Sequence, residues 1–226
     1  AGITSEMDAV PSLCLGVPDV SLYEMVGAYA SFANKGQWLE PIFVTRILDK
    51  EGNEIYNNLN KRKSNTVLSE EDAYVMLQLL KGTVDGVRGS QDGIKMERRT
   101  GTAMRLRFPK TTRPYAGISK TTEIAAKTGT TQSQADGWFM GITPDLVSGV
   151  WVGGEDRDIR FSNLSKGSGT NMALPIWGYY MNKVYADSSL KISKGKFEKP
   201  EGPINVEVNC EKINGEWSVN QWIKKA

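Results

Sequence analysis

Histidine is absent from this sequence of 226 residues. Without an imidazole the chain cannot form a Ser-His-Asp triad, a Cys-His dyad or a histidine-ligated metal site. Acyl-transfer chemistry in this chain would have to use a lysine or a carboxylate as its base. We expect neither a metal nor another cofactor.

Cysteine is scarce, because Cys14 and Cys210 are the only two. Two distant thiols cannot build a disulfide framework or a zinc site. Since Cys14 lies between Leu13 and Leu15, we expect it to be a small, buried, apolar side chain. A Cys14–Cys210 disulfide is the alternative that an oxidising compartment would allow.

Long apolar runs and an excess of one charge are also missing. No run reaches the roughly 18 residues that cross a bilayer, and no signal peptide is recognisable. With 28 basic and 26 acidic residues the net charge is +2, which gives no reason to expect a nucleic acid partner. A local basic run is interpreted as a solvated face, because no nucleic-acid-binding motif accompanies it. The run comprises Arg98, Arg99, Arg105, Arg107, Lys110 and Arg113.

The composition itself is that of a globular protein. With 39% hydrophobic and 24% charged residues, the chain has room for one large domain or two small ones. We expect residues 1–186 to belong to one domain and residues 187–226 to form a linker with a small β extension. Residues 187–203 are rich in serine, lysine and proline, and Asn214-Gly215 is a hairpin turn signal after an alternating apolar run.

Three segments carry helical patterns. Ser21-Leu-Tyr-Glu24 is a capping box, which predicts a helix that ends near Gly36. Ser69 precedes three acidic residues and marks the start of a second helix. Residues 171–185 are expected to form a third. The residues expected to face inward are Leu22, Met25, Val26, Tyr29 and Ala33, then Ala73, Val75, Met76, Leu79 and Leu80, then Met172, Ala173, Ile176, Tyr179 and Tyr180.

Strand patterns occur in two places. Residues 42–48 and 54–56 flank a glycine-containing turn and predict a β-hairpin. Three further runs predict consecutive antiparallel strands over residues 123–131, 138–142 and 146–152. The glycine-rich stretch 82–101 is expected to be loop. The elements together predict an α+β fold, with helices packed on an antiparallel sheet.

A polar motif, Lys127-Thr128-Gly129-Thr130-Thr131, follows a short apolar run. Alternate residues of a strand share a face, so Lys127, Gly129 and Thr131 should point one way and the other two threonines the opposite way. Gly129 leaves room for another molecule's backbone, while a lysine and threonine hydroxyls suit a carboxylate. A solvated strand end would contain the same residues, and the spacing alone does not separate these two interpretations.

Lys127-Thr128-Gly129 matches the third motif of the penicillin-recognising serine acyltransferases. The wider run, Lys127–Gln132 with Asp136-Gly-Trp-Phe-Met-Gly-Ile-Thr-Pro-Asp145, resembles class A penicillin-binding proteins. These are bifunctional peptidoglycan glycosyltransferase/transpeptidases. The segment Pro11–Gly36 is similar to the family's chain between its second and third motifs. The resemblance covers residues 1–185 and implies part of a penicillin-binding/β-lactamase-like transpeptidase domain.

The resemblance also implies a function. The parent protein would be a D,D-transpeptidase that acts on peptidoglycan stem peptides and is trapped by β-lactams. Lys127 and Thr130 would be catalytic, and Lys127, Thr128, Gly129 and Thr130 would bind substrate. The implied location is extracytoplasmic, on the periplasmic side of the inner membrane, in a protein with a membrane anchor. A D,D-carboxypeptidase or β-lactamase of the same superfamily, or a non-enzymatic scaffold module, are the alternatives.

The family's nucleophilic Ser-x-x-Lys and its Ser-x-Asn are not found before Lys127. Three later matches are interpreted as coincidence: Ser188–Lys191, Ser193–Lys196 and Ser218-Val-Asn220. The tetrapeptide Arg99-Thr100-Gly101-Thr102 resembles the lysine motif and is assigned a structural role. We therefore expect the C-terminal part of a class A protein, without its glycosyltransferase domain and nucleophile, that is inactive alone.

This interpretation also predicts incomplete packing. Without the nucleophile-bearing helix, some apolar side chains of the sheet would lie uncovered. The strands carry Trp138, Met140, Ile142, Val147, Val150 and Trp151, and we expect some of these to be the uncovered ones. We expect the chain to fold well only with the N-terminal part of the same protein or with a second copy of itself.

Overall fold

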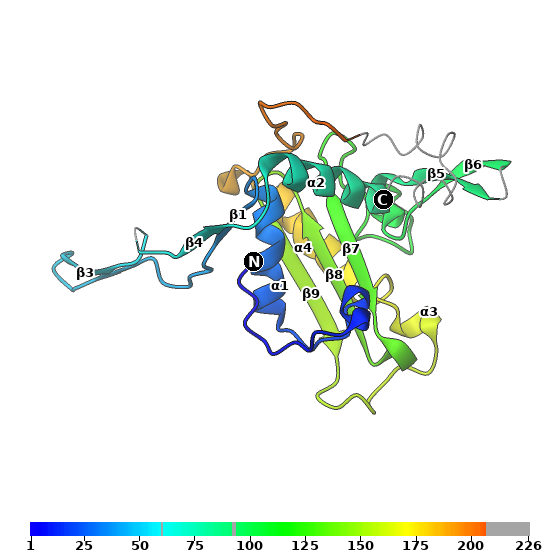
Figure 1. The fold of residues 1–226 in the computed structure, drawn as a ribbon, viewed down its shortest axis with the longest axis horizontal. Coiled ribbons are helices and arrows are strands. Elements are labelled where there is room, and N and C mark those ends of the chain that lie inside the picture. Colours follow the sequence, from blue (N-terminus) through cyan, green and yellow to red (C-terminus); the bar gives the residue numbers. More distant parts are fainter. Residues whose placement is uncertain (60, 92–93, 207–226) are drawn as a thin grey trace.

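A computed structural model describes residues 1–59, 61–91 and 94–206, and its centre is a three-stranded antiparallel sheet (Figure 1). The strands β7 (Ala125–Thr130), β8 (Asp136–Ile142) and β9 (Val147–Gly153) lie in the order β7-β8-β9. A tight turn, in which the Thr143 N–H donates to the Leu146 carbonyl at 2.8 Å, joins β8 to β9. The predicted antiparallel strands and the α+β fold class are confirmed.

Helices cover both faces of this sheet (Figure 1). On one face, which we term the α4 face, Trp177 of α4 (Ala173–Ala186) donates its indole N–H to the Ser148 hydroxyl at 2.8 Å. A Cβ added to Gly141 would lie 2.3 Å from the Trp177 ring, so this contact requires glycine. On the other face, termed the α1 face, Leu22 of α1 (Leu22–Ala33) lies against Gly149 of β9.

Two apolar clusters make up the core. The larger joins α4 to the α4 face, and its Phe139 and Trp177 rings lie 5.1 Å apart. The smaller lies where α2 (Glu70–Asp85) meets the opposite end of the sheet and includes Tyr74, Leu77 and Phe197. Tyr29 and Phe32 of α1, predicted as core residues, pack against this smaller cluster.

The predicted helix starts are confirmed. Ser21 and Glu24 form the capping box of α1, and the Ser69 hydroxyl accepts the Asp72 N–H at 3.0 Å at the start of α2. α1 ends at Ala33, and the chain turns at Gly36 with φ of 83°.

The predicted inward faces are wrong in several places. Met76 and Leu79 of α2 are exposed, as are Ile176, Tyr179 and Tyr180 of α4. The buried residues are Ala73, Tyr74, Leu77 and Val84 in α2, and Ala173, Leu174, Trp177, Gly178, Met181 and Val184 in α4. In α1 the buried residues are Glu24, Gly27 and Ser31, and the predicted apolar residues are only partly buried. Both α2 and α4 have apolar residues on more than one side, so the neighbouring sheet decides which side is covered.

The Glu24 carboxylate ties the N-terminal segment to α1. It accepts hydrogen bonds from the main-chain N–H groups and hydroxyls of Thr4 and Ser5, at 2.6–2.8 Å, and from Ser21. These bonds, with that from the Ser5 hydroxyl the largest cause, hold the pKa of Glu24 well below its ordinary value.

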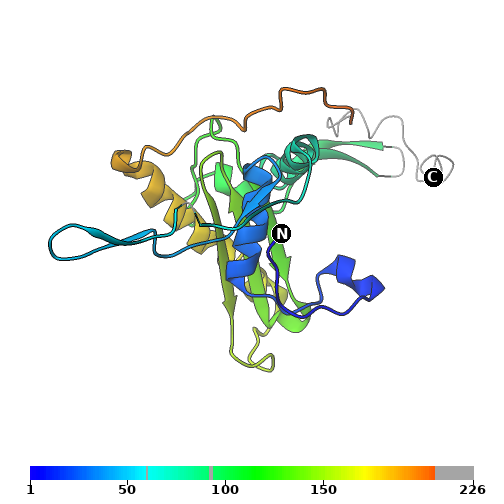
Figure 2. The same ribbon diagram turned by 60° about the vertical axis from the view of Figure 1, so that its left-hand side comes forward.

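In the described part of the chain, three two-stranded ribbons lie outside the central sheet. The predicted hairpin of β2 (Arg46–Leu48) and β3 (Glu54–Asn57) is confirmed and projects away from the sheet in both views (Figures 1 and 2). β1 (Gln37–Leu39) pairs with β4 (Ser64–Thr66). β5 (Val87–Gln91) pairs with β6 (Ile94–Thr100), so the loop predicted over residues 82–101 is wrong: α2 continues to Asp85 and a hairpin follows.

The remaining elements are short. The helix α3 spans Leu164–Gly167, and the 3-10 helices of the described residues span Pro11–Leu15, Met104–Arg107, Gln132–Gln134 and Ser188–Leu190. Cys14 lies in the first of these and is exposed, so its predicted burial is wrong. Cys210, the Asn214-Gly215 turn and Ser218-Val-Asn220 lie outside the described residues. No helix among residues 1–59, 61–91 and 94–206 is long and apolar enough to cross a bilayer.

Candidate functional site

The lysine motif lies on an edge strand of the central sheet. β7 pairs with β8 on one side, and its other side is the edge of the three-stranded sheet. Along β7 the environment changes abruptly, because Ala125 and Ala126 are fully buried and Lys127 and Thr130 are exposed. We term Lys127–Thr130 the β7 tip, and residues 119–126, which lead into it, the β7 root.

The side chains of the tip alternate as the sequence predicts. Lys127 pairs with Met140 and Gly129 with Trp138, on the α1 face of the sheet. A Cβ added to Gly129 would lie 3.0 Å from the Trp138 Cβ, so glycine keeps this face of the tip open. The Lys127 ammonium donates to the main-chain carbonyl of Thr128, and no ion pair joins it to a carboxylate among the residues that the structure describes.

The two threonines of the tip point to the α4 face. The Thr128 hydroxyl donates to the Thr102 hydroxyl at 3.3 Å. The Thr130 hydroxyl accepts the Gly169 N–H at 3.0 Å, which leaves its own proton to donate to a ligand. The sequence analysis assigned Thr102 only a structural role and did not single out Gly169. These contacts span 26 and 39 residues of sequence, and no local pattern signals either.

Main-chain groups of the tip also face the edge. In an antiparallel pair the N–H and C=O of one residue point to the same side, and successive residues alternate. Thr131 N–H donates to the Asp136 carbonyl, so odd-numbered residues of β7 face β8. The N–H groups of Thr128 and Thr130 therefore point away from β8, toward the open edge.

The chain turns sharply after the tip. Ser133 and Gln134 have positive φ values of 60° and 55°, which non-glycine residues adopt at a cost. The Thr131 hydroxyl accepts the Asp136 N–H at 3.0 Å and closes this turn. The Oδ1 atom of Asp136 is buried without a hydrogen-bond partner among the described residues. A buried carboxylate oxygen of this kind requires an explanation.

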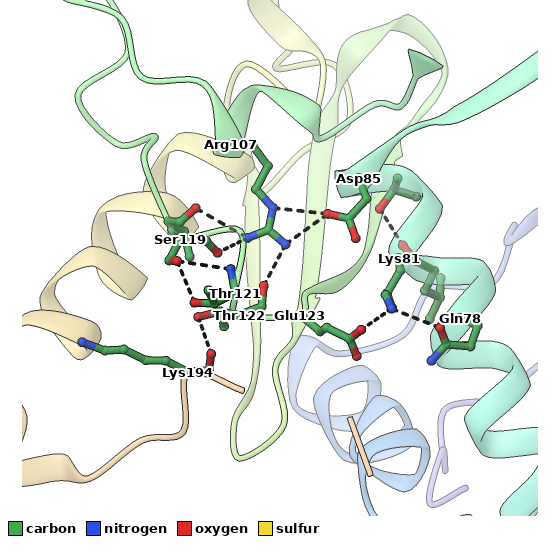
Figure 3. Close-up of polar contacts among 12 residues, drawn as sticks. Gln78, Lys81, Asp85, Arg107, Ser119, Thr121, Thr122, Glu123 and Lys194 are labelled. Atoms are coloured by element: carbon green, nitrogen blue, oxygen red, sulfur yellow. Dashed lines mark hydrogen bonds and ion pairs between the residues drawn. The ribbon is translucent and has the colours of Figure 1, made fainter. Parts of the chain in front are cut away.

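The β7 root is held by a buried arginine (Figure 3). The Arg107 guanidinium, whose side chain is 3% exposed, pairs with Asp85 of α2 at 3.1 Å. It also donates to the carbonyls of Ser119 and Thr122, the latter at 2.8 Å. The prediction that the basic run is a solvated face is wrong for Arg107, because main-chain carbonyls that flank β7 provide it with buried partners.

A second ion pair also holds the β7 root (Figure 3). It involves Lys81, which lies one helical turn before Asp85 on α2. The Lys81 ammonium donates to Glu123 and, at 3.1 Å, to the Gln78 side chain. The other Glu123 oxygen accepts the Phe197 N–H at 2.9 Å, so residues near the C-terminal end of the described chain are fixed here too. Burial, with the charge of Glu123 added, raises the pKa of Tyr74 nearby.

The segment predicted as a linker thus contacts the domain along part of its length. Phe197 is buried in the smaller core cluster, and the Glu123 N–H donates to the Gly195 carbonyl at 2.9 Å. The boundary at residue 187 stays a prediction.

The Ser-x-x-Lys matches lie far from the tip. Ser193 and Lys196 line a cavity of about 240 Å³ beside Pro144 and Asp145, at the turn between β8 and β9. That turn follows Ile142, which pairs with Ala125 at the opposite end of β7 from Thr130. Ser188 begins an exposed 3-10 turn, and Lys191 follows it with a left-handed φ of 53°. Neither pair has the position of a nucleophile for the tip.

The chain contains no metal centre in its described portion, where no group of three or more histidine, cysteine or acidic residues is positioned to hold an ion. The tip instead combines one cation, two hydroxyls and outward main-chain N–H groups. This set of donors suits a carboxylate and a developing oxyanion.

Comparison with known proteins identifies the family. Residues 9–154, more than half of the chain, match the model of the penicillin binding protein transpeptidase domain. The chain therefore belongs to the family of penicillin-binding protein transpeptidase domains. The resemblance inferred from the lysine motif is confirmed.

Two curated relatives agree. Penicillin-binding protein 2D of Bacillus subtilis is 33% identical over 93% of this chain and 26% of its own length. Penicillin-binding protein 1A of Aquifex aeolicus is 31% identical over 88% of this chain and 22% of its own length. The chain thus spans about a quarter of the length of these relatives.

Solved structures share the fold. Penicillin-binding protein 1A of Haemophilus influenzae has a TM-score of 0.66 at 23% identity, over 86% of this chain and 30% of that one. PonA1 of Mycobacterium tuberculosis has a TM-score of 0.63 at 21% identity, over 88% of this chain and 47% of that one. Identity this low shows the common fold, and the roles of individual residues must be argued from the site.

Proposed function

We propose that this chain forms one wall of the active site of a peptidoglycan D,D-transpeptidase. The observation that carries the proposal is the β7 tip, where an exposed lysine, two threonine hydroxyls and outward N–H groups lie together on an edge strand. An edge strand can pair with an extended peptide, and a stem peptide that ends in D-Ala-D-Ala is such a ligand. Membership of the transpeptidase family supports this substrate class.

Each residue of the tip has a proposed role. Lys127 supplies positive potential beside the reacting carbonyl, and the hydroxyls of Thr128 and Thr130 bind the terminal carboxylate of the substrate. The Thr130 N–H is one donor to the oxyanion of the tetrahedral intermediate, and the N–H of the nucleophilic serine is the other. Removal of one such donor typically lowers the rate by about 10²–10³.

The nucleophile is proposed to come from outside the 226 residues. Its serine attacks the D-Ala-D-Ala carbonyl, D-alanine leaves with a proton, and an amine of a second stem peptide then displaces the serine to form the cross-link. β-Lactams would mimic the donor peptide and trap the acyl form. The structural neighbour PonA1 of Mycobacterium tuberculosis has also been solved in complex with penicillin V. This chemistry takes place in an extracytoplasmic compartment, where peptidoglycan is assembled.

The α1 face near the tip offers a surface for the segment that carries this serine. Trp151 is 40% exposed and pairs with Trp138, which is partly exposed and adjoins Gly129. Asp136, whose Oδ1 atom has no hydrogen-bond partner among the described residues, lies on the same face. Met140 and Ile142, two of the six side chains among which uncovered ones were predicted, are buried by this chain itself, whereas Trp138 and Trp151 near the tip stay partly exposed.

Covalent labelling with a fluorescent penicillin tests the proposal. The complete reading frame that encodes Ala1–Ala226 is expressed beside the 226-residue chain alone, and intact mass is measured after incubation. We expect one penicilloyl adduct on the complete protein, its loss on Lys127→Ala, and no adduct on the chain alone. An adduct on the isolated chain that disappears with Ser193→Ala or Ser188→Ala would instead show that this chain carries its own nucleophile.

Reaction products separate transfer from hydrolysis. The complete protein is incubated with a peptide ending in D-Ala-D-Ala, with and without an amine acceptor. A transpeptidase forms the peptide–acceptor product, whereas a carboxypeptidase releases D-alanine at the same rate without the acceptor.

A further inference from the structure

Thr83, in the last turn of α2, contacts the edge of β7 at the residue that precedes Lys127. Its hydroxyl lies 2.8 Å from the Ala126 carbonyl and 2.9 Å from the Leu80 carbonyl. Within an α-helix the Leu80 carbonyl already accepts the Val84 N–H. The hydroxyl proton is therefore needed at Ala126, whose carbonyl lies on the edge side of β7.

The position of the Ala126 carbonyl follows from the alternation of the strand. Even-numbered residues of β7 direct their N–H and C=O groups away from β8, so Ala126, Thr128 and Thr130 share the edge. Ala126 is fully buried, and an unpaired carbonyl there would be costly. Thr83 satisfies it and covers the edge at that residue, while the N–H groups of Thr128 and Thr130 still face outward.

Thr83 also organises the segment beside the tip. Its main-chain carbonyl accepts the Ala103 N–H at 2.8 Å. A Cβ added to Gly101 would lie 2.7 Å from the same carbonyl, so glycine is required for this approach. Thr102, between these two residues, receives the hydrogen bond from the Thr128 hydroxyl. One residue thus links α2, the strand and the hydroxyl partner of the tip.

We infer that Thr83 is a positioning residue for the β7 tip: its hydroxyl fixes the main chain next to Lys127 and ends the accessible edge at Ala126, so that a bound peptide pairs only with Thr128 and Thr130. The inference rests on the proposed function, because it assigns Thr83 a role in placing the substrate of that site. It concerns the register of the bound backbone, and Thr83 itself touches no reacting atom.

Two substitutions that differ by one hydroxyl isolate this role. Thr83→Val keeps the branched shape and removes the donor, whereas Thr83→Ser keeps the donor. In the complete protein we expect Thr83→Val to lower the second-order rate constant of penicillin acylation about tenfold, less than the ~10²-fold that a 1 Å misplacement can cost. Thr83→Ser should stay within about twofold of wild type, because the hydroxyl contribution is retained.

Thr143 provides a matched control. Its hydroxyl also donates to a main-chain carbonyl, that of Leu146 at 3.1 Å, but at the far end of the sheet from the tip. Thr143→Val should leave the acylation rate unchanged, and it should lower the melting temperature no more than Thr83→Val does, because the Thr143 N–H still donates to the Leu146 carbonyl. A general loss of packing would instead slow both variants alike.

The outcomes separate this inference from the proposed function. If wild-type protein is not acylated at all, the proposed function fails and the role of Thr83 fails with it. If wild type reacts and Thr83→Val reacts as fast as Thr83→Ser, only the inference fails. Equal slowing by Thr143→Val also overturns it. Should Thr83→Val not fold, the pair Thr83→Ala and Thr83→Ser differs by the same oxygen and must show the same tenfold difference.

Discussion

The root and the tip of β7 belong to one short segment and are held in opposite ways. The root is fixed by Arg107 with Asp85, by Lys81 with Glu123 and by the main chain at Phe197. At the tip, Lys127 and Thr130 are exposed, and the N–H groups of Thr128 and Thr130 point toward the edge of the sheet. A strand anchored at one end presents its other end in a defined geometry without the need to bury it. Preorganised donors of this kind stabilise a transition state without further rearrangement.

The comparison predicts that the largest loss of stability follows substitution of Arg107. In Arg107→Met, the Asp85 carboxylate loses its partner and the carbonyls of Ser119 and Thr122 lose a buried donor. The Asp85 side chain is 40% exposed, so most of the loss should come from the carbonyls left without their donor, at about 1–3 kcal/mol each. Urea denaturation of the chain, followed by tryptophan fluorescence, measures the change in the free energy of unfolding.

Arg157 supplies the control for this measurement. It forms an ion pair with Asp19 in which both side chains are well exposed. Exposed pairs contribute about 0–1 kcal/mol, so Arg157→Met should change the free energy of unfolding little. A similar loss of free energy of unfolding in both variants would mean that Arg107 stabilises the fold no more than an exposed ion pair does.

The second ion pair should have a smaller effect. Lys81 and Glu123 are each less than one-fifth exposed, at 18% and 17%. We expect Lys81→Met and Glu123→Gln each to cost about 1–3 kcal/mol, since a hydrogen bond to a charged group is lost. In the double variant the losses should not add, because both substitutions remove the same contact. Fully additive losses would show that the two residues act independently.

The sequence predicted the structure of the tip but not that of the root. The lysine motif, its glycine and the alternation of its side chains follow from a local strand pattern. The burial of Arg107 at the root was not predicted, because this arginine stands in a run of basic residues. Its partners, Asp85 and Thr122, are 22 and 15 residues away in the sequence. Burial of an arginine depends on carbonyls that only the fold brings together.

The helices show the same limit. Capping boxes and helix starts depend on neighbouring residues, so Ser21 and Ser69 were identified correctly. The inward face of α4 was not, because Ile176 and Tyr180 have the same periodicity as the buried Trp177 and Met181. Local periodicity gives an apolar stripe, and the packing partner decides which stripe is covered.

The Glu24 carboxylate ties the N-terminal segment to α1 and does not contact β7, and its contribution to stability can be tested at acid pH. Because the pKa of Glu24 is lowered in the folded chain, its contribution to stability is fully present above the unfolded value of 4.5. It is lost as the pH falls from there through the lower folded pKa. Glu24→Gln should therefore destabilise the chain at pH 7 and make its stability less sensitive to acid below pH 4.5. Denaturation series at several pH values measure this slope, and parallel curves for the two proteins would contradict the assignment.

The smallest change in stability is predicted at the tip itself. Lys127 is exposed, and among the described residues its ammonium donates to the carbonyl of Thr128 alone, so Lys127→Gln should alter the free energy of unfolding by no more than about 0.5 kcal/mol. Lys199→Gln, at an exposed lysine outside β7, is the reference. In the complete protein, however, the role proposed for Lys127 predicts that Lys127→Gln abolishes penicillin acylation while Lys199→Gln leaves it intact, because the positive potential proposed for the reacting carbonyl is removed. If the tip binds substrate, Lys127→Gln must abolish acylation and leave the free energy of unfolding nearly unchanged. If Lys127→Gln destabilised the chain as much as Lys81→Met does, the lysine would be part of the scaffold, and the contrast between an anchored root and an available tip would be wrong.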